Sequence, residues 1–219
     1  VDATAEHCVA YKPNLAFYEC YGIEGLRALD ATVDYIRTKY PEIFLIADAK
    51  RGDIGNTAKM YAKAFFEEMD FDAVTIAPYM GADSVTPFLE YKDKWAIVLA
   101  LTSNASAYQF QNAVKDGKPL YQAVMEEMME ISTPDNMMFV VGATKADKLE
   151  ELRSFCPDNF FLVPGVGAQG GSAEEVIAHG ANDHGGLLIN SSRGILFADS
   201  TENFAYAAGK VAAKTANLQ

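Results

Sequence analysis

The chain has 219 residues, half of them hydrophobic, and its 30 acidic against 18 basic side chains give a formal net charge of −12. This length allows one substantial hydrophobic core, and the acidic balance argues against a protein that covers a nucleic-acid backbone. No apolar stretch is long enough to span a membrane, so we expect partners of neither kind.

The cysteines are three in number, widely spaced and without a C-x-x-C pattern: Cys8, Cys20 and Cys156. They predict neither a disulfide framework nor a zinc site, and the three histidines do not recur at metal-ligand spacings. The N-terminus lacks the basic region and apolar run of a secretory signal. We therefore expect a cytoplasmic protein without a metal site.

Seven short apolar runs recur along the chain, and each is followed by a segment with helical periodicity. Runs that are apolar on both faces are typical of parallel strands covered by helices. Amphipathic helices are expected between them, for example over Gly25–Lys39, Thr57–Met69 and Ala173–His179. The predicted strands are Cys8–Tyr11, Ile43–Ala47, Ala73–Ile76, Ala96–Leu101, Met138–Val141, Phe160–Val163 and Leu187–Ile189.

Seven strand–helix units are one short of a (β/α)8 barrel of the TIM type. The opening Val1-Asp2-Ala3-Thr4 is typical of the tail of a helix, so we expect a single barrel domain over residues 1–219 whose first strand is absent. An open doubly wound sheet is the alternative. Polar clusters follow nearly every predicted strand, as barrel chemistry requires, and this favours the barrel. The weakly patterned stretch Ser103–Pro119 is predicted to be a long, functional loop after a strand.

Charged residues gather where the second apolar strand ends. Asp48 and Lys50 are two apart, so both are expected on one face of the strand, with Asp53 in the loop beyond. Each charge alone could be a solvated loop residue, but burying either ion of the pair without a partner costs several kcal/mol. Lys12 precedes Pro13, which ends the first strand, so it is expected beside Asp48 in an alternating array of charges.

A glycine-rich loop follows the sixth predicted strand at Pro164–Gly171, where Gly165, Gly167 and Gly170 form a G-x-G-x-x-G pattern. A dinucleotide fingerprint belongs after the opening strand of a fold, so this position favours a monophosphate held by backbone N–H groups. Arg193, after the next strand, offers bidentate donors to the same phosphate.

These segments together resemble one enzyme family. The pattern D-x-K-x-x-D-I-x-x-T at Asp48–Thr57 and K-P-N-x-A-F-Y-E at Lys12–Glu19 are similar to the bacterial branch of the orotidine 5'-monophosphate decarboxylases. The resemblance continues in L-T-S-N at Leu101–Asn104, in the Pro164–Gly171 loop and in I-N-S-S-R-G-I at Ile189–Ile195.

The resemblance implies that the protein converts orotidine 5'-monophosphate to UMP and CO2 in pyrimidine biosynthesis, without a cofactor. Lys50 would donate the proton, and Asp48 would lie beside the substrate carboxylate. It further implies a homodimer in which part of the charge array serves the neighbouring subunit. The residues so implied are Lys12, Asp48, Lys50 and Asp53 for catalysis; Ser103 for the pyrimidine; Pro164, Gln169 and Arg193 for the phosphate; and Asp53, Ile54 and Thr57 for the shared site.

Two alternatives stay open. The first is a Mg2+-dependent sugar-phosphate aldolase or decarboxylase of the same barrel superfamily, which uses a similar D-x-K-x-x-D array. The second is a non-catalytic nucleotide-binding scaffold, because the ribose-binding Asp that the family has on its first strand has no counterpart here.

Overall fold

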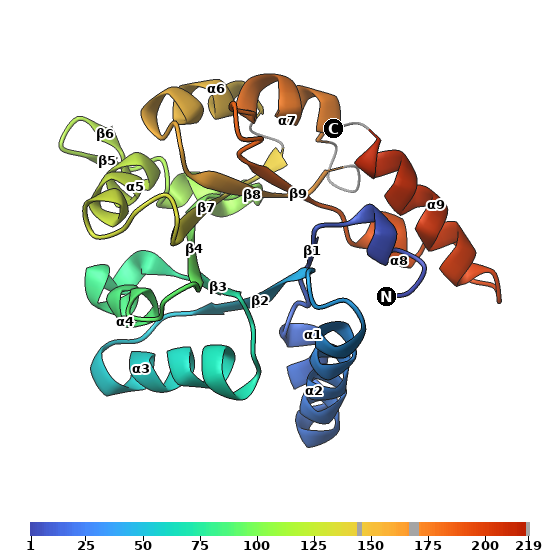
Figure 1. Ribbon diagram of the computed structural model, residues 1–219. Helices are drawn as coiled ribbons and strands as arrows, with labels where there is room; N and C mark the ends of the chain where they lie inside the picture. The colour runs from blue at the N-terminus through green and yellow to red at the C-terminus, as the bar shows by residue number, and fades with distance from the viewer. Residues whose placement is uncertain (144–145, 167–170, 218–219) are drawn as a thin grey trace. The chain divides into compact units, whose positions relative to one another are not determined.

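The computed structural model describes residues 1–143, 146–166 and 171–217 (Figure 1). The chain forms two compact units. Unit 1 comprises Val1–Cys8, Ala100–Glu126 and Met138–Gln219, and unit 2 comprises Val9–Leu99 and Glu127–Met137. None of the helices in the described ranges is both long and apolar enough to cross a bilayer.

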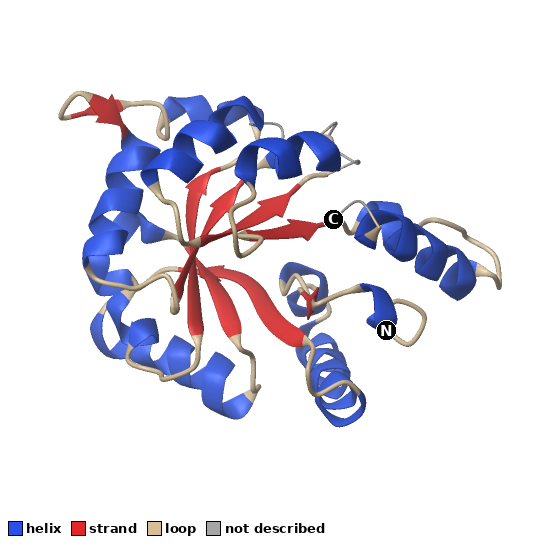
Figure 2. Cartoon of the chain, turned by 45° about the horizontal axis from the view of Figure 1, so that its top comes forward, coloured by secondary structure: helices blue, strands red, loops and turns tan. Residues whose placement is uncertain are grey.

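Unit 2 is built on parallel strands. The pairings Ala10 with Phe44, Ala47 with Val74 and Thr75 with Ile97 set their register. The helices of unit 2 lie on the outer face of these strands (Figure 2). Its strands are β1 (Ala10–Tyr11), β2 (Phe44–Arg51), β3 (Ala73–Ile76) and β4 (Trp95–Leu101), and its helices are α1 (Ala16–Glu19), α2 (Gly22–Lys39), α3 (Gly55–Lys63), a π-helix (Ala64–Glu68), 3-10 turns (Pro78–Met80 and Ala82–Ser84) and α4 (Thr86–Leu89).

The core of unit 2 explains why its strands are apolar on both faces. Every residue of β3 is buried, and aromatic side chains from the helices fill the space beside the strands. Phe65 and Phe71 meet edge to face with ring centroids 6.3 Å apart, and Phe66 meets Phe88 at 6.1 Å. Aromatic pairs in this geometry add to the stabilisation from buried area.

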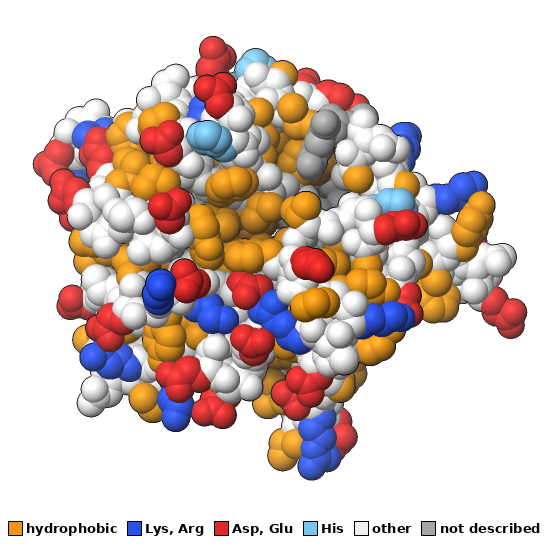
Figure 3. All heavy atoms as spheres, viewed as in Figure 1, with side chains coloured by type: hydrophobic (Ala, Val, Ile, Leu, Met, Phe, Trp, Pro, Cys, Tyr) orange, Lys and Arg blue, Asp and Glu red, His pale blue; other side chains and the backbone are white. Residues whose placement is uncertain are grey.

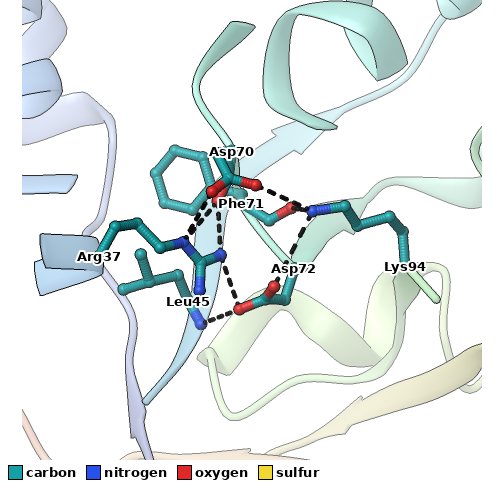
Figure 4. A network of polar contacts seen from close by, with 6 residues as sticks. All are labelled: Arg37, Leu45, Asp70, Phe71, Asp72 and Lys94. Atoms are coloured by element: carbon teal, nitrogen blue, oxygen red, sulfur yellow. Dashed lines mark hydrogen bonds and ion pairs between the residues drawn. The ribbon is translucent and has the colours of Figure 1, made fainter. Parts of the chain in front are cut away.

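Charged residues join the N-terminal ends of β2, β3 and β4 (Figure 4). The Asp72 carboxylate accepts the backbone N–H of Leu45 at 2.8 Å and lies 2.8 Å from the Arg37 guanidinium. Lys94 donates to the backbone oxygen of Phe71 at 2.8 Å and is ion-paired with Asp70 at 3.3 Å. This network fixes where three neighbouring strands begin.

Replacing Asp72 with alanine should lower the free energy of unfolding by about 1–3 kcal/mol, because the N–H of Leu45 loses its acceptor in a buried strand. Asp72→Asn keeps an acceptor oxygen and should lose less. Urea titrations of both variants measure the difference. The charged groups at the other end of β2 are untouched, so a change in turnover number in either variant would contradict a purely structural role.

Unit 1 contains a second set of parallel strands, with Val140 opposite Leu162 and Pro164 opposite Asn190. The helices α6 and α7 lie side by side along its strands (Figure 1). Its elements are a 3-10 helix (Ala5–His7), the end of β4, a 3-10 helix (Ala105–Gln109), β5 (Val114–Lys115), β6 (Lys118–Pro119), the first part of α5 (Leu120–Glu130), β7 (Met137–Val141) from Met138 on, α6 (Ala146–Phe155), β8 (Phe160–Pro164), α7 (Ala173–Gly180), β9 (Leu187–Asn190), α8 (Arg193–Leu196) and α9 (Phe204–Ala216).

Arg153 ties the N-terminal ends of two of these strands to the end of α7. Its guanidinium donates to the backbone oxygens of Asn159, Gly180 and Gly186 at 2.8–2.9 Å and lies 4.0 Å from the centre of the Phe161 ring. One planar group thus satisfies carbonyls that precede β8 and β9.

All seven predicted strands are present, and their ends shift by at most two residues, except that β2 continues four residues beyond its predicted end at Ala47, to Arg51. The predicted helix over Thr57–Met69 begins earlier, at Gly55, and its last turn is a π-helix. The predicted loop Ser103–Pro119 does connect a strand to a helix, but it contains the 3-10 helix Ala105–Gln109 and the β5–β6 hairpin. Short polar turns of this kind leave no clear periodicity in a sequence.

Candidate active site

Two lysines share one buried carboxylate in unit 2. The Nζ of Lys12 lies 2.6 Å from Oδ2 of Asp48, and the Nζ of Lys50 is ion-paired with Oδ1 of the same residue. The side chains of Lys12 and Asp48 are only 9% and 7% exposed, whereas that of Lys50 is 49% exposed. Lys12, Asp48 and Lys50 together form the charged array. It consists of a buried ion pair, Lys12 with Asp48, and one ammonium group, that of Lys50, which is accessible to solvent or to a ligand.

Two opposing influences act on the pKa of Asp48. Burial, the larger single effect, disfavours the charged form, but the charges and hydrogen bonds of Lys12 and Lys50 together hold the pKa below its ordinary value of 3.8. Asp48 is therefore a carboxylate at neutral pH, which keeps both ammonium groups in place.

Lys50 meets Asp48 through a bulge rather than by regular strand alternation. Ala47 pairs with Val74 and Arg51 pairs with Ile76, so three residues of β2 lie opposite the single residue Thr75. Lys50 has a positive φ of 48°. Asp48 and Lys50 do form an ion pair, as their spacing predicted. The predicted reason, a regular strand with both side chains on one face, is wrong, because the bulge changes the direction of the backbone between them.

Asp53 and its neighbours lie just beyond this bulge. Asp53 is half-buried, and its Oδ1 accepts the backbone N–H of Ile54 at 2.8 Å. Within the described part of the chain Asp53 has no ion pair with Lys50. Ile54 is 46% exposed, and Thr57 is exposed on the first turns of α3. One chain thus unites Lys12, Asp48 and Lys50 but does not bring Asp53 to them.

Ser103 follows the end of β4 in unit 1, and its hydroxyl has no partner. Among the described residues, it is the buried side-chain oxygen or nitrogen that lacks a hydrogen bond. Its neighbour Thr102 is fully engaged, because Gln111 accepts the backbone N–H of Thr102 at 2.8 Å and donates to its hydroxyl at 2.7 Å. A buried hydroxyl without a partner is costly and often marks a ligand site.

The room for Ser103 comes from Gly142, the residue after β7. A Cβ at position 142 would lie 1.9 Å from the Ser103 hydroxyl, and the Gly142 N–H donates to the backbone oxygen of Leu101 at 2.8 Å. Any side chain there would push Ser103 aside.

The glycine-rich loop and Arg193 follow neighbouring strands of unit 1. Pro164 ends β8 opposite Asn190 of β9, and Gly165 has a φ of 96°. Arg193 begins α8, is exposed and has no ion pair in the described ranges. Gln169, predicted to hold the phosphate, lies outside the described residues.

Three residues of these sites had not been predicted: Thr75, Gln111 and Gly142. A threonine inside the apolar run of β3 was the one available signal, because a buried hydroxyl needs partners.

Among the described residues, no three His, Cys, Asp or Glu side chains are gathered to hold a metal ion. In the space-filling view, acidic and basic side chains lie next to one another over the region of β2 and β3 (Figure 3).

Comparison with known proteins gives consistent results. The chain is 56% identical to the orotidine 5'-phosphate decarboxylase of Phocaeicola vulgatus over 215 residues, which are 98% of this chain and 79% of that protein. It is similar to the solved structure of Leishmania donovani OMP decarboxylase, with a TM-score of 0.86 and 36% identity over 99% of this chain and 83% of the other. This chain also matches the solved structure of Leishmania donovani UMP synthase, with a TM-score of 0.89 and 38% identity. The match covers 100% of this chain but only 48% of the UMP synthase chain.

Parallel strands that alternate with helices, together with these structural matches, assign the fold to the (β/α)8 barrel class. The model of the orotidine 5'-phosphate decarboxylase / HUMPS family matches residues 1–208. The chain belongs to this family.

Proposed function

We propose that the protein decarboxylates orotidine 5'-monophosphate to UMP in pyrimidine biosynthesis. The observation that carries the proposal is the buried Asp48 carboxylate with its two lysines, one of which is half exposed. The relatives named as decarboxylases support it, since they cover nearly the whole chain. As part of the same proposal, the chain is one barrel domain.

The proposed step breaks the bond between C6 of the pyrimidine and its carboxylate. CO2 leaves, and the electron pair of that bond stays on C6. The Lys50 ammonium lies where this negative charge develops, and it then transfers its proton to C6 to complete UMP. Lys12 remains paired with Asp48 and keeps that carboxylate charged when Lys50 has given up its proton.

Repulsion between Asp48 and the substrate carboxylate is only part of the driving force. Two like charges about 4 Å apart repel by roughly 4 kcal/mol at an effective dielectric constant near 20. Enzymes typically lower reaction barriers by about 8–23 kcal/mol. Most of the acceleration must therefore come from interactions with the developing carbanion, supported by binding energy from the phosphate.

The groups of unit 1 bind the rest of the nucleotide in this proposal. Ser103 hydrogen-bonds the pyrimidine, which gives its unpaired hydroxyl a partner. Arg193 and Gln169 hold the phosphate beside the loop that starts at Pro164.

The cysteines form no disulfide in the described residues, which is consistent with the cytoplasmic location that we propose.

We also propose a homodimer in which Asp53, Ile54 and Thr57 serve the partner's site. Asp53 has no ion pair with the array of its own chain, and Ile54 exposes an apolar side chain beside it. A second subunit would give both residues a partner.

Replacing Ser103 with alanine tests the pyrimidine contact. The free protein should be as stable as the parent, or up to about 1 kcal/mol more stable, because an unsatisfied hydroxyl disappears. The ratio kcat/KM should fall about 10- to 100-fold, as expected when one hydrogen bond to substrate is lost. Thermal unfolding and steady-state kinetics measure the two effects. Ser106→Ala, in the same loop, is the control and should change neither; a destabilised Ser103→Ala would contradict the proposed contact.

An assay with purified protein tests the reaction itself. The absorbance of orotidine 5'-monophosphate should decline as UMP accumulates, at the same rate with and without EDTA. A rate that depends on added Mg2+ favours the metal-dependent aldolase or decarboxylase, and tight nucleotide binding without turnover favours the non-catalytic scaffold.

A further inference from the structure

The bulge in β2 leaves a backbone group that the strand ladder does not satisfy. Three residues of β2 face one residue of β3 between the pairs Ala47–Val74 and Arg51–Ile76. The backbone N–H of Lys50 consequently has no carbonyl of β3 opposite it, and it donates instead to the hydroxyl of Thr75 at 2.9 Å.

The same hydroxyl also reaches the catalytic carboxylate. Thr75 Oγ1 lies 3.2 Å from Oδ1 of Asp48, the oxygen that is paired with Lys50. A threonine hydroxyl accepts and donates at once, so it can accept the N–H of Lys50 and donate to Asp48. Thr75 is 1% exposed, and its hydroxyl makes both of these hydrogen bonds with residues of the charged array.

The backbone of Lys50 needs such a restraint. A φ of 48° is unfavourable for a residue with a side chain and persists where the surroundings hold it. The neighbouring peptides are held by other groups: the Arg51 guanidinium donates to the oxygen of Ala49 at 2.8 Å, and Ala77 donates to the oxygen of Arg51 at 2.8 Å. The N–H of Lys50 itself is held by Thr75.

We propose that Thr75 is a positioning residue for the decarboxylation: its hydroxyl locks the bulge so that the Lys50 ammonium and the Asp48 carboxylate keep the geometry that the reaction requires. This inference rests on the proposed function and deepens it. Thr75 does not touch the substrate; it acts through the two residues that do.

Removing the hydroxyl while keeping the shape is the sharpest test. In Thr75→Val, kcat should fall about 10- to 100-fold, the cost of a misplacement of about 1 Å, while KM stays unchanged because the phosphate and pyrimidine contacts are intact. Thr75→Ser restores the hydroxyl and should restore kcat. Ser84→Ala removes another fully buried hydroxyl, bonded to the Gly81 oxygen at 2.7 Å, and serves as the control for a mere loss of stability.

Amide hydrogen exchange at Lys50 gives a readout that needs no activity. Exchange should be about tenfold faster in Thr75→Val than in the parent or in Thr75→Ser, because the N–H has lost its acceptor. The proposal requires both the fall in kcat and the faster amide exchange in Thr75→Val, and either effect without the other overturns it. A Thr75→Ser variant with a kcat as low as that of Thr75→Val overturns it as well. If the parent protein itself does not decarboxylate the nucleotide, the proposed function fails, and the exchange measurement alone decides whether Thr75 holds Lys50. Thr75→Ala replaces Thr75→Val in both measurements if the valine variant does not fold.

Discussion

Lys50→Ala should reduce kcat by at least about 10⁴-fold while UMP still binds. In the proposed mechanism the ammonium group of Lys50 is both the proton donor and the charge that faces the developing carbanion, and these roles account for about 10²–10⁴ and 10²–10³ in rate, respectively. Binding of UMP, measured by calorimetry, should survive because Ser103 and Arg193 are unchanged.

Lys63→Ala is the matched control for this variant. Lys63 lies in α3, is 47% exposed and is ion-paired with Glu68 at 3.5 Å, so it has a similar exposure and a carboxylate partner outside the array. Its kcat should equal that of the parent. Turnover retained in Lys50→Ala would remove Lys50 from the reaction.

The same variant tests whether sites are shared between subunits. Asp53→Asn should also be inactive, and a mixture of the two refolded variants should regain activity at about a quarter of the sites, since each mixed dimer has one intact site. A mixture that stays inactive would contradict the sharing of Asp53.

Asp48→Asn should have the largest effect on stability, a loss of about 3 kcal/mol at pH 7. The substitution removes the counter-charge of Lys12, whose side chain is only 9% exposed, and breaking a buried ion pair in this way is strongly destabilising. Activity should be lost as well, because Lys50 loses its anchor. Asp34→Asn, at an exposed position of α2, is the control and should leave stability unchanged.

The pH dependence of this loss has a definite sign. The pKa of Asp48 is lower in the folded protein than its ordinary value of 3.8, so its contribution to stability is fully present above that value. As the pH falls through the folded-state pKa, Asp48 becomes protonated and the contribution disappears. Urea titrations should therefore show a parent–variant gap that is constant down to about pH 5 and shrinks below about pH 4. A gap that widens on acidification would contradict the lowered pKa.

The sequence was sufficient to predict which strands carry the array. Apolar runs of strand length, each followed by charged residues, predict that Lys12 and Asp48 follow neighbouring parallel strands, and their ion pair at 2.6 Å follows from that order. Apolar runs report burial, so most strand ends could be placed to within two residues, whereas the charged end of β2 extends four residues further than predicted, to Arg51.

The contacts that refine the site could not be predicted in this way. The bulge opposite Thr75 depends on a register shift between parallel strands, and strands that are apolar on both faces show no alternation from which that register could be read. The two hydrogen bonds between Thr102 and Gln111, one donated by each residue, span nine residues of weakly patterned loop, and the Arg37–Asp72 contact links residues far apart in the sequence. Each of these contacts depends on which residues the folded chain brings together, and the pattern along one segment does not report that.

A crystal structure with UMP bound tests the central claim most directly, namely that the Lys50 ammonium, anchored on Asp48, is the group that protonates C6. The account predicts that Lys50 Nζ lies within about 3.5 Å of C6 and remains paired with Asp48, with Arg193 on the phosphate. A nucleotide bound with the Lys50 amine turned into bulk solvent, or with C6 beside another side chain, would contradict it.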